Sequence, residues 1–248
     1  MDHSLNTLAA VAVTFFVAGI VKGVTGMGLP TVAMGVLGAL MSPLSAASLL
    51  LIPSFVTNVW QLVTGPNFTG LIVRLWLMML GVLAGTLVGV GLLTSANTKW
   101  ATIGLGVALA AYAGTSLFAR AWYTPAGMQG WLSPTIGILT GLISGGTGVF
   151  VIPAVPYLQS LGLSKDDLIQ ALGLSFTVST IALGISLAGS GAFRLGNLVD
   201  SGLSIVPALA GMRTGTLIRE RISPATFRRW FLVCLMLLGI DLTIRALF

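Results

Sequence analysis

The stretch that decides the fold runs from Gly19 to Pro30 and reads G-I-V-K-G-V-T-G-M-G-L-P. It places closely spaced glycines and a single charge, Lys22, inside a long apolar segment. Beyond Lys22, 51 residues pass without a charged side chain before Arg74, whereas one membrane-spanning helix needs roughly 20 residues. The stretch therefore predicts a membrane helix with a glycine-rich break in its middle.

The composition of the whole chain agrees with a location inside a lipid bilayer. Charged residues make up 7% of the 248 residues, whereas they make up about 25% of soluble domains. A further 26 residues without charge separate Asp167 from Arg194. These runs are rich in Leu, Ala, Gly and Val, and they lack the strict alternation of an outer-membrane barrel. The predicted fold class is therefore an all-α polytopic membrane protein.

The lengths of the apolar runs predict about eight hydrophobic segments, separated by charges and by Pro, Gly or Asn breaks. The first and the fifth are too long for one ordinary span, and each carries a Gly-rich break. The predicted segments are 5–41, 44–64, 71–93, 99–119, 132–162, 167–190, 198–218 and 225–247.

The two long segments are also copies of one another. The string G-L-I-S-G-G-T-G, from Gly141 to Gly148, repeats the first string at an offset of 122, and Ser144 stands where the first string has Lys22. Later matches at an offset of 130 pair Gly81 with Gly211. The sequence thus predicts two homologous halves, 1–124 and 125–248, within a single integral membrane domain. Internal repeats of this kind are common in secondary transporters.

The repeat allows two orientations. If all eight segments cross the membrane, each half crosses an even number of times and the halves are parallel, which is the preferred interpretation. If each broken segment instead folds back as a re-entrant hairpin, each half crosses three times and the halves are inverted.

The basic residues indicate which side faces the cytoplasm. Cytoplasmic loops carry an excess of Lys and Arg, so the Arg-rich turn between 219 and 229 is expected inside and both chain termini outside. With parallel halves, Lys99 and Lys165 join the cytoplasmic side. The residues then expected outside are Arg74, Arg120, Arg194 and Arg245.

The two breaks are candidate binding sites. A helix interrupted at membrane depth leaves backbone N–H and C=O groups unpaired, so a break persists where it is buried in protein or lines a polar cavity. Exposed N–H groups at the start of a half-helix suit an anion. Both breaks contain the string G-x-T-G, at Gly23–Gly26 and at Gly145–Gly148.

Lys22 stands directly before the first of these strings. Ionisable residues inside a membrane are costly, and they commonly mark functional sites. Lys22 is therefore predicted to bind an anion, and the structural alternative is a lysine that reaches the interface or satisfies carbonyl groups at the break.

Other polar side chains and glycines have structural as well as functional interpretations. Asn58, Gln61 and Gln170 either face a cavity or bridge helices. Asp241 and Arg245, spaced i, i+4, are expected to neutralise one another on one helix face. Close helix packing is predicted for two rows of small residues, Gly81, Gly85, Gly89 and Gly137, Gly141, Gly145.

The two broken strings, Gly19–Pro30 and Gly141–Pro153, resemble the duplicated motif of the TauE/SafE sulfite exporter family. The stretch from Arg221 to Trp230 is similar to the C-terminal part of the same family. The resemblance implies a transporter with two related halves that moves sulfur-containing or small organic anions, often outward. It also implies that the substrate is surrounded by Gly23, Thr25, Gly26, Gly145, Gly146, Thr147 and Gly148.

The predicted function is export of a small anion by alternating access around a site between the two breaks. Lys22, Ser144, Asn58 and Gln170 complete the set of candidate substrate-binding residues. Sulfite, thiosulfate and sulfonates are the expected substrates, because the family implies sulfur-containing anions. A passive anion channel and a carboxylate transporter remain as alternatives.

Other classes of function have little support. An intramembrane enzyme is disfavoured because the single histidine, His3, stands at the N-terminal tip and no aspartyl pair is present. One cysteine, Cys234, cannot form a two-cysteine metal site, so neither a metal nor a cofactor is expected. Thinly spread basic residues argue against nucleic-acid binding. The expected surroundings are a lipid bilayer, the bacterial cytoplasmic membrane.

Overall fold

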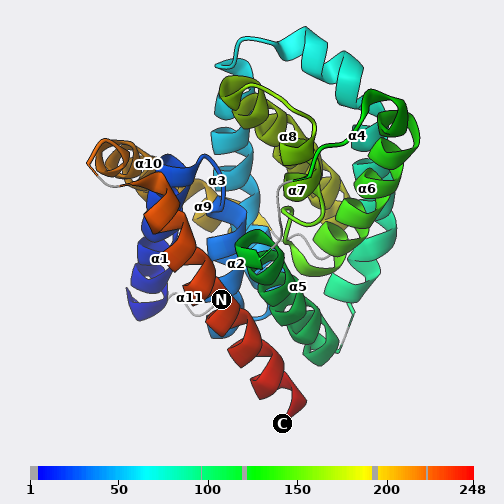
Figure 1. Cartoon of the computed structure of the whole chain (residues 1–248). Coiled ribbons are helices and arrows are strands. Elements are labelled where there is room, and N and C mark those ends of the chain that lie inside the picture. The colour runs from blue at the N-terminus through cyan, green and yellow to red at the C-terminus, as the bar shows by residue number, and fades with distance from the viewer. Residues whose placement is uncertain (1–4, 96, 119–121, 192–194, 222) are drawn as a thin grey trace.

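The computed structural model describes residues 5–95, 97–118, 122–191, 195–221 and 223–248 (Figure 1). This part of the chain contains helices and no strand, which confirms the all-α prediction. The helices are α1 (Leu5–Thr25), α2 (Leu29–Leu40), α3 (Pro43–Val63), α4 (Phe68–Leu93), α5 (Thr98–Phe118), α6 (Ala126–Thr147), α7 (Ala154–Ser160), α8 (Lys165–Gly189), α9 (Leu195–Leu203), α10 (Ile205–Arg219) and α11 (Pro224–Leu247).

The helices follow the predicted segments closely in position. The structure divides the first predicted segment into α1 and α2, and the fifth into α6 and α7. The seventh predicted segment, which was expected to be one helix, is divided into α9 and α10 at Ser204. Among the described residues, six helices are long and apolar enough to cross a membrane, namely α1, α3, α4, α5, α8 and α11.

Large apolar side chains cover the outside of the helix bundle. Val88 on α4 is 74% exposed and Val206 on α10 is 71% exposed. All six tryptophans are also exposed, as expected for rings that lie at a membrane interface. A soluble protein seldom leaves so much apolar surface open, so this surface is suited to lipid.

Rows of glycine bring α4 and α6 into close contact. A Cβ atom built on Gly85 would lie 2.2 Å from the carbonyl oxygen of Ile138, and one on Gly141 would lie 2.3 Å from the oxygen of Val82. The glycines are therefore required for the backbones to approach, which confirms the predicted packing role of both rows. Because residue numbers rise together along the contact, from Gly81 to Gly89 on one side and from Pro134 to Leu142 on the other, α4 and α6 run in the same direction.

The pair α1 and α10 is built in the same way. A Cβ atom on Gly23 would lie 2.3 Å from the carbonyl oxygen of Met212, and one on Gly215 would lie 2.2 Å from that of Ile20. These two helices also run in the same direction. By the sequence offsets, α1 matches α6 and α10 matches α4, so each half of the chain packs its first helix against a helix of the other half.

The remaining matched helices contact each other directly and run antiparallel. In α3 and α8, Leu62 lies against Gly173, whereas Ser54 lies against Thr180. In α5 and α11, Lys99 contacts Leu247 and Gly106 packs on Gly239, so the order is again reversed (Figure 1). Parallel repeats require matched helices to point the same way. The preference for parallel repeats is therefore wrong, and the matched helices have the inverted arrangement.

This arrangement arises because the broken segments fold back. We call the end of the bundle that carries Arg219, Arg221, Arg228 and Arg229 the Arg-rich end. α1 begins at the opposite end and ends near the Arg-rich end. α2 then runs back away from the Arg-rich end, so α3 begins at the same end as α1 (Figure 1). The hairpin alternative thus describes this chain better than eight alternating crossings.

The inverted arrangement changes the expected sides of two basic residues. Arg74 lies near the start of α4, at the Arg-rich end, where it donates to the carbonyl oxygen of Leu161 at 3.0 Å. Lys99 lies at the opposite end, where it donates to the oxygen of Leu247. Both placements reverse the prediction, and because one basic residue replaces the other, the excess of positive charge at the Arg-rich end is unchanged. Arg120, Arg194 and His3 lie outside the described residues.

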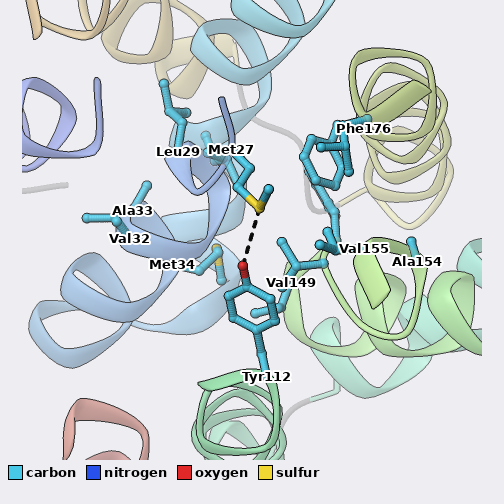
Figure 2. Packing of buried hydrophobic residues seen from close by; sticks show 14 of the residues in the cluster. Met27, Leu29, Val32, Ala33, Met34, Tyr112, Val149, Ala154, Val155 and Phe176 are labelled. Atoms are coloured by element: carbon cyan, nitrogen blue, oxygen red, sulfur yellow. Dashed lines mark hydrogen bonds between the residues drawn. The ribbon is translucent and has the colours of Figure 1, made fainter. Parts of the chain in front are cut away.

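Apolar side chains fill the middle of the bundle. Figure 2 shows Met27, Met34, Tyr112, Val149 and Phe176 packed together from α2, α5, α8 and the chain around the breaks. The hydroxyl of Tyr112 points at the sulfur of Met27, 3.5 Å away. This part of the bundle is therefore apolar and closely packed.

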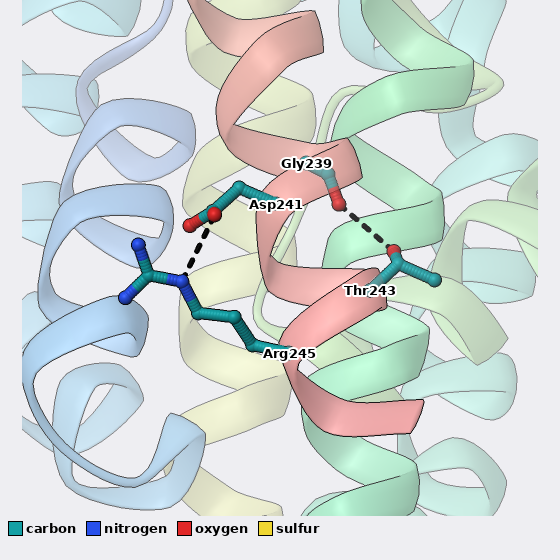
Figure 3. Close-up of polar contacts among 4 residues, drawn as sticks. All are labelled: Gly239, Asp241, Thr243 and Arg245. Atoms are coloured by element: carbon teal, nitrogen blue, oxygen red, sulfur yellow. Dashed lines mark hydrogen bonds and ion pairs between the residues drawn. The ribbon is translucent and has the colours of Figure 1, made fainter. Parts of the chain in front are cut away.

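Asp241 and Arg245 form the expected i, i+4 ion pair on α11, with 2.9 Å between Nε and Oδ1 (Figure 3). Their side chains are 44% and 75% exposed. The pair faces outward, away from both breaks, which agrees with a structural role.

Candidate functional site

The two breaks have the same backbone turn. Gly26 and Gly148 adopt left-handed conformations with φ of 78° and 71°. In each turn the glycine N–H donates to the carbonyl four residues earlier, of Lys22 and of Ser144, and both bonds are 2.8 Å long. A glycine in this conformation is a common end to a helix, because other residues are strained there.

The threonines of the two strings stabilise these turns. Thr25 donates to the carbonyl oxygen of Val21 at 2.8 Å, and Thr147 donates to that of Ile143 at 2.6 Å. Each hydroxyl also accepts the N–H two residues later, from Met27 and from Val149. The hydroxyls that were predicted to face the substrate therefore serve first to end their helices.

A glutamine side chain holds the first break in place. The amide of Gln61 donates to the carbonyl oxygen of Gly26 at 3.0 Å and to that of Ile169 at 2.7 Å. It thereby ties the break to the start of α8. The sequence left open whether Gln61, like Asn58 and Gln170, faces a cavity or bridges helices, and in the structure it bridges. Its sequence signal was a lone amide one turn after Asn58 in an apolar helix.

Lys22 lies on the last turn of α1 and is 3% exposed. Its ammonium donates to Thr57 Oγ1 at 3.1 Å and to Asn58 Oδ1. Both acceptors are neutral, and no carboxylate pairs with Lys22 among the described residues. A buried charge is costly unless it is paired, so this arrangement favours an anionic ligand beside Lys22.

A chain of hydrogen bonds continues from Asn58 across the bundle. The Asn58 amide donates to Ser54 at 3.0 Å, and Ser54 lies 3.3 Å from the hydroxyl of Thr180 on α8. The predicted residues Lys22 and Asn58 are thus brought together, and the network links α1, α3 and α8.

Gln170 has the structural role that the sequence left open. Its amide donates to the carbonyl oxygen of Leu62 at 2.7 Å, and its oxygen accepts the backbone N–H of Asn67 at 2.7 Å. The side chain bridges α8 to the turn between α3 and α4. It is fully buried in that contact.

The second break has no comparable charge. Ser144, which matches Lys22, shares a hydrogen bond of 3.1 Å with Thr86 on α4. Gly146 packs on Leu92, and a Cβ atom on Gly148 would lie 2.8 Å from the sulfur of Met34. Gly145 is in contact with the α4 backbone at Thr86. This break is closely packed by apolar and hydroxyl groups.

In the part of the chain that the structure describes, the two strings form separate turns that adjoin one apolar cluster. Along α5, Tyr112 reaches Met27 next to the first break, whereas Gly104 contacts Thr147 of the second. Eight residues of helix correspond to about 12 Å. The apolar cluster of Figure 2 lies between the two breaks. The seven glycines and threonines taken from the family motif therefore form two separate turns.

An open pocket of about 260 Å³ adjoins the first break at the Arg-rich end. Thr25 and Met27 line it from the break, and three basic side chains line it from α8, α10 and α11, namely Lys165, Arg219 and Arg228. None of the described residues that line it is acidic. The pocket thus offers a positively charged approach to the turn that follows Lys22.

The family model described as sulfite exporter TauE/SafE matches residues 11–242, nearly the whole chain. The chain belongs to the TauE/SafE sulfite exporter family. This confirms the resemblance that the duplicated strings indicated. No curated protein and no solved structure matches the chain significantly.

Membership makes the chain an integral membrane protein and a transporter of sulfite-type anions. The family is one of transporters, which agrees with the weak signal for catalysis in the sequence. In this TauE/SafE protein the open pocket and the unpaired lysine both belong to the first break.

Proposed function

We propose that the protein exports sulfite or a closely related sulfur oxyanion across a bacterial cytoplasmic membrane. The observation that carries the proposal is the buried ammonium of Lys22, which has neutral partners and lies one turn before the pocket-lining Thr25. Family membership supplies the class of substrate.

The basic pocket is the proposed loading position. Lys165, Arg219 and Arg228 attract an anion from the cytoplasm, and a cleft lined by one sign of charge raises the local concentration of the opposite ion. The anion then moves to Lys22 when the turn at Gly26 shifts. There it receives the third N–H of the ammonium, because two N–H groups already bind Thr57 and Asn58.

The two breaks differ in a way that suits alternating access. The first break adjoins an open pocket at the Arg-rich end, whereas the second is closed by Met34 and Leu92. We infer two homologous, inverted halves that exchange these conformations, so that the second break opens when the first closes. An inside-negative potential favours outward movement of an anion by about 2.3 kcal/mol per charge per 100 mV, so export needs no carboxylate relay in principle.

A thermal-shift screen of the detergent-solubilised protein tests the substrate class. A ligand that binds the folded state raises its apparent stability. Sulfite, thiosulfate and small sulfonates are expected to raise the Tm and to compete for one site, while acetate and cations of the same size have little effect. A shift from acetate that matches the shift from sulfite would favour a carboxylate transporter.

Counterflow in proteoliposomes tests the carrier mechanism. Labelled sulfite is expected to accumulate transiently and saturably when unlabelled sulfite is loaded inside. Large single-channel currents without counterflow would instead identify a passive anion channel and would reject alternating access.

A further inference from the structure

A second basic groove lies on the outer surface of the Arg-rich end. It is formed between the last turn of α5 and the first turns of α11 and has a volume of about 510 Å³. Arg228 and Arg229 line its upper part, and Phe118, Leu232 and Met236 line the rest. The groove therefore combines two guanidinium groups with an apolar floor.

The charges of this groove have no acidic partner in the part of the chain that the structure describes. No acidic side chain lines it, and neither arginine forms a salt bridge among the described residues. The surrounding surface is suited to lipid, because Phe118 is 79% exposed and the neighbouring Trp230 is 67% exposed. A tryptophan in such a position is typical of the membrane–water interface.

We propose that this groove binds an anionic phospholipid of the cytoplasmic leaflet. The lipid phosphate contacts Arg228 and Arg229, and an acyl chain lies along Leu232 and Met236 toward the membrane interior. Guanidinium groups suit phosphate because they present several donors in one plane. Basic pockets between helices on the cytoplasmic side are well placed to recognise anionic lipid headgroups.

The groove is distinct from the substrate pocket, although the two share Ala225 and Arg228. Arg228 lines both cavities, whereas Arg229 lines only the groove. Arg229 therefore allows lipid binding to be tested without altering the proposed substrate site. Because a lipid-binding measurement needs no sulfite, its failure is independent of the proposed transport function.

Native mass spectrometry of the full chain, with phosphatidylglycerol or phosphatidylcholine of the same acyl chains, tests the proposal. The wild-type protein is expected to retain phosphatidylglycerol preferentially. Arg229→Gln is expected to reduce that retention about fivefold. Arg221→Gln is the matched control, because it removes the same charge from the same end of the bundle but does not line the groove.

A second variant keeps both arginines and fills the groove. Val233→Trp is expected to reduce phosphatidylglycerol retention while the protein still elutes as a single folded species. Equal retention of the two lipids by the wild type would overturn the proposal. So would an equal loss for Arg221→Gln and Arg229→Gln, which would indicate general attraction to anionic surfaces.

Discussion

The first and second breaks share a backbone but differ in their chemistry. Gly26 and Gly148 have the same conformation, and Thr25 and Thr147 make the same turn contacts. The first break, however, adjoins a buried lysine and a basic pocket, whereas the second is packed by apolar groups. The two breaks thus share one backbone turn. The first break differs in its charge, because it has Lys22 where the second has the matching Ser144.

The comparison separates two roles for the G-x-T-G string. The glycines and the threonine are needed in both halves because they end a helix and let neighbouring backbones approach. Anion recognition requires something more, which the first break has in the form of Lys22 and the adjoining basic pocket, whose charges come from the second half of the chain. A repeated motif in this fold therefore indicates architecture first and function second.

The largest expected effect is an all-or-none labelling pattern that follows from the inverted arrangement. In a background with Cys234 replaced, cysteines at Asn6 and Met41 are expected to react from one side of the membrane and a cysteine at Ala225 from the other. The reason is that the first break folds the chain back, so that α1 and α3 begin at the same end. Labelling of the Asn6 and Met41 sites from opposite sides would contradict the inverted arrangement and support parallel repeats.

Bulky substitutions at the packing glycines should damage both breaks equally. Gly23→Val and Gly145→Val place a Cβ atom within 2.3 Å and 2.5 Å of a facing carbonyl oxygen. Because neither contact can be relieved by a flexible side chain, loss of at least about 3 kcal/mol of stability is expected, with little folded protein recovered. Gly91→Val is the control, because nothing lies within 4 Å of a Cβ atom there. Size-exclusion profiles and apparent Tm values provide the measurement.

Alanine substitutions at Gly26 and Gly148, which share a left-handed backbone conformation, should show how the surroundings of the two turns differ. Each substitution costs about 1–2 kcal/mol in backbone strain. At Gly148 the new Cβ atom also meets the Met34 sulfur at 2.8 Å, whereas at Gly26 the nearest atom is 3.6 Å away. Gly148→Ala is therefore expected to lower the apparent Tm more than Gly26→Ala. A larger decrease for Gly26→Ala would show that the first break is the more closely packed.

Much of this fold follows from simple patterns in the sequence. The segments α3, α4, α5, α8 and α11 begin and end within a few residues of their predicted bounds, because long apolar runs and prolines mark them clearly. The glycine spacing also predicted close packing. The partners of the glycine rows, and the antiparallel course of α3 and α8, depend on which helices meet in space, and no local pattern shows this.

The candidate site was predictable in part. Lys22 stood out because charges are rare in apolar segments, and its contact with Asn58 agrees with that interpretation. The partners of Gln61 and the basic pocket were missed, because they depend on residues from α8, α10 and α11 that are distant in sequence. Gln170 was predicted as a candidate substrate-binding residue. In the structure its buried amide bridges the backbone of Leu62 and Asn67, a role that the sequence alone does not distinguish from substrate binding.

The smallest expected effect concerns the basic pocket beside the first break. Arg219→Gln is expected to weaken sulfite binding about threefold at low ionic strength, and less at high salt, because partly exposed charges are screened. Arg221→Gln, on the same turn but outside the pocket, is expected to have little effect. Equal changes for the two variants would assign the attraction to the net charge of this end.

The central claim is that anion recognition belongs to the first break and depends on Lys22. A titration of sulfite against purified Lys22→Gln, Lys22→Met and Ser144→Ala protein tests it most directly. Lys22→Gln keeps an N–H donor for Asn58 and removes the charge, while Lys22→Met keeps only the bulk of the stem. Lys22→Arg retains the charge in a different position and should have an intermediate effect.

Both neutral Lys22 variants are expected to weaken sulfite binding at least about tenfold, because a charge near the anion is worth about 3 kcal/mol at 6 Å with an effective dielectric of 20, and desolvation offsets only part of it. Ser144→Ala is expected to change the affinity less than about twofold, since Ser144 contacts Thr86 within the packed second break. Wild-type affinity in folded Lys22→Gln and Lys22→Met protein would contradict the account and assign the site to the backbone turns alone.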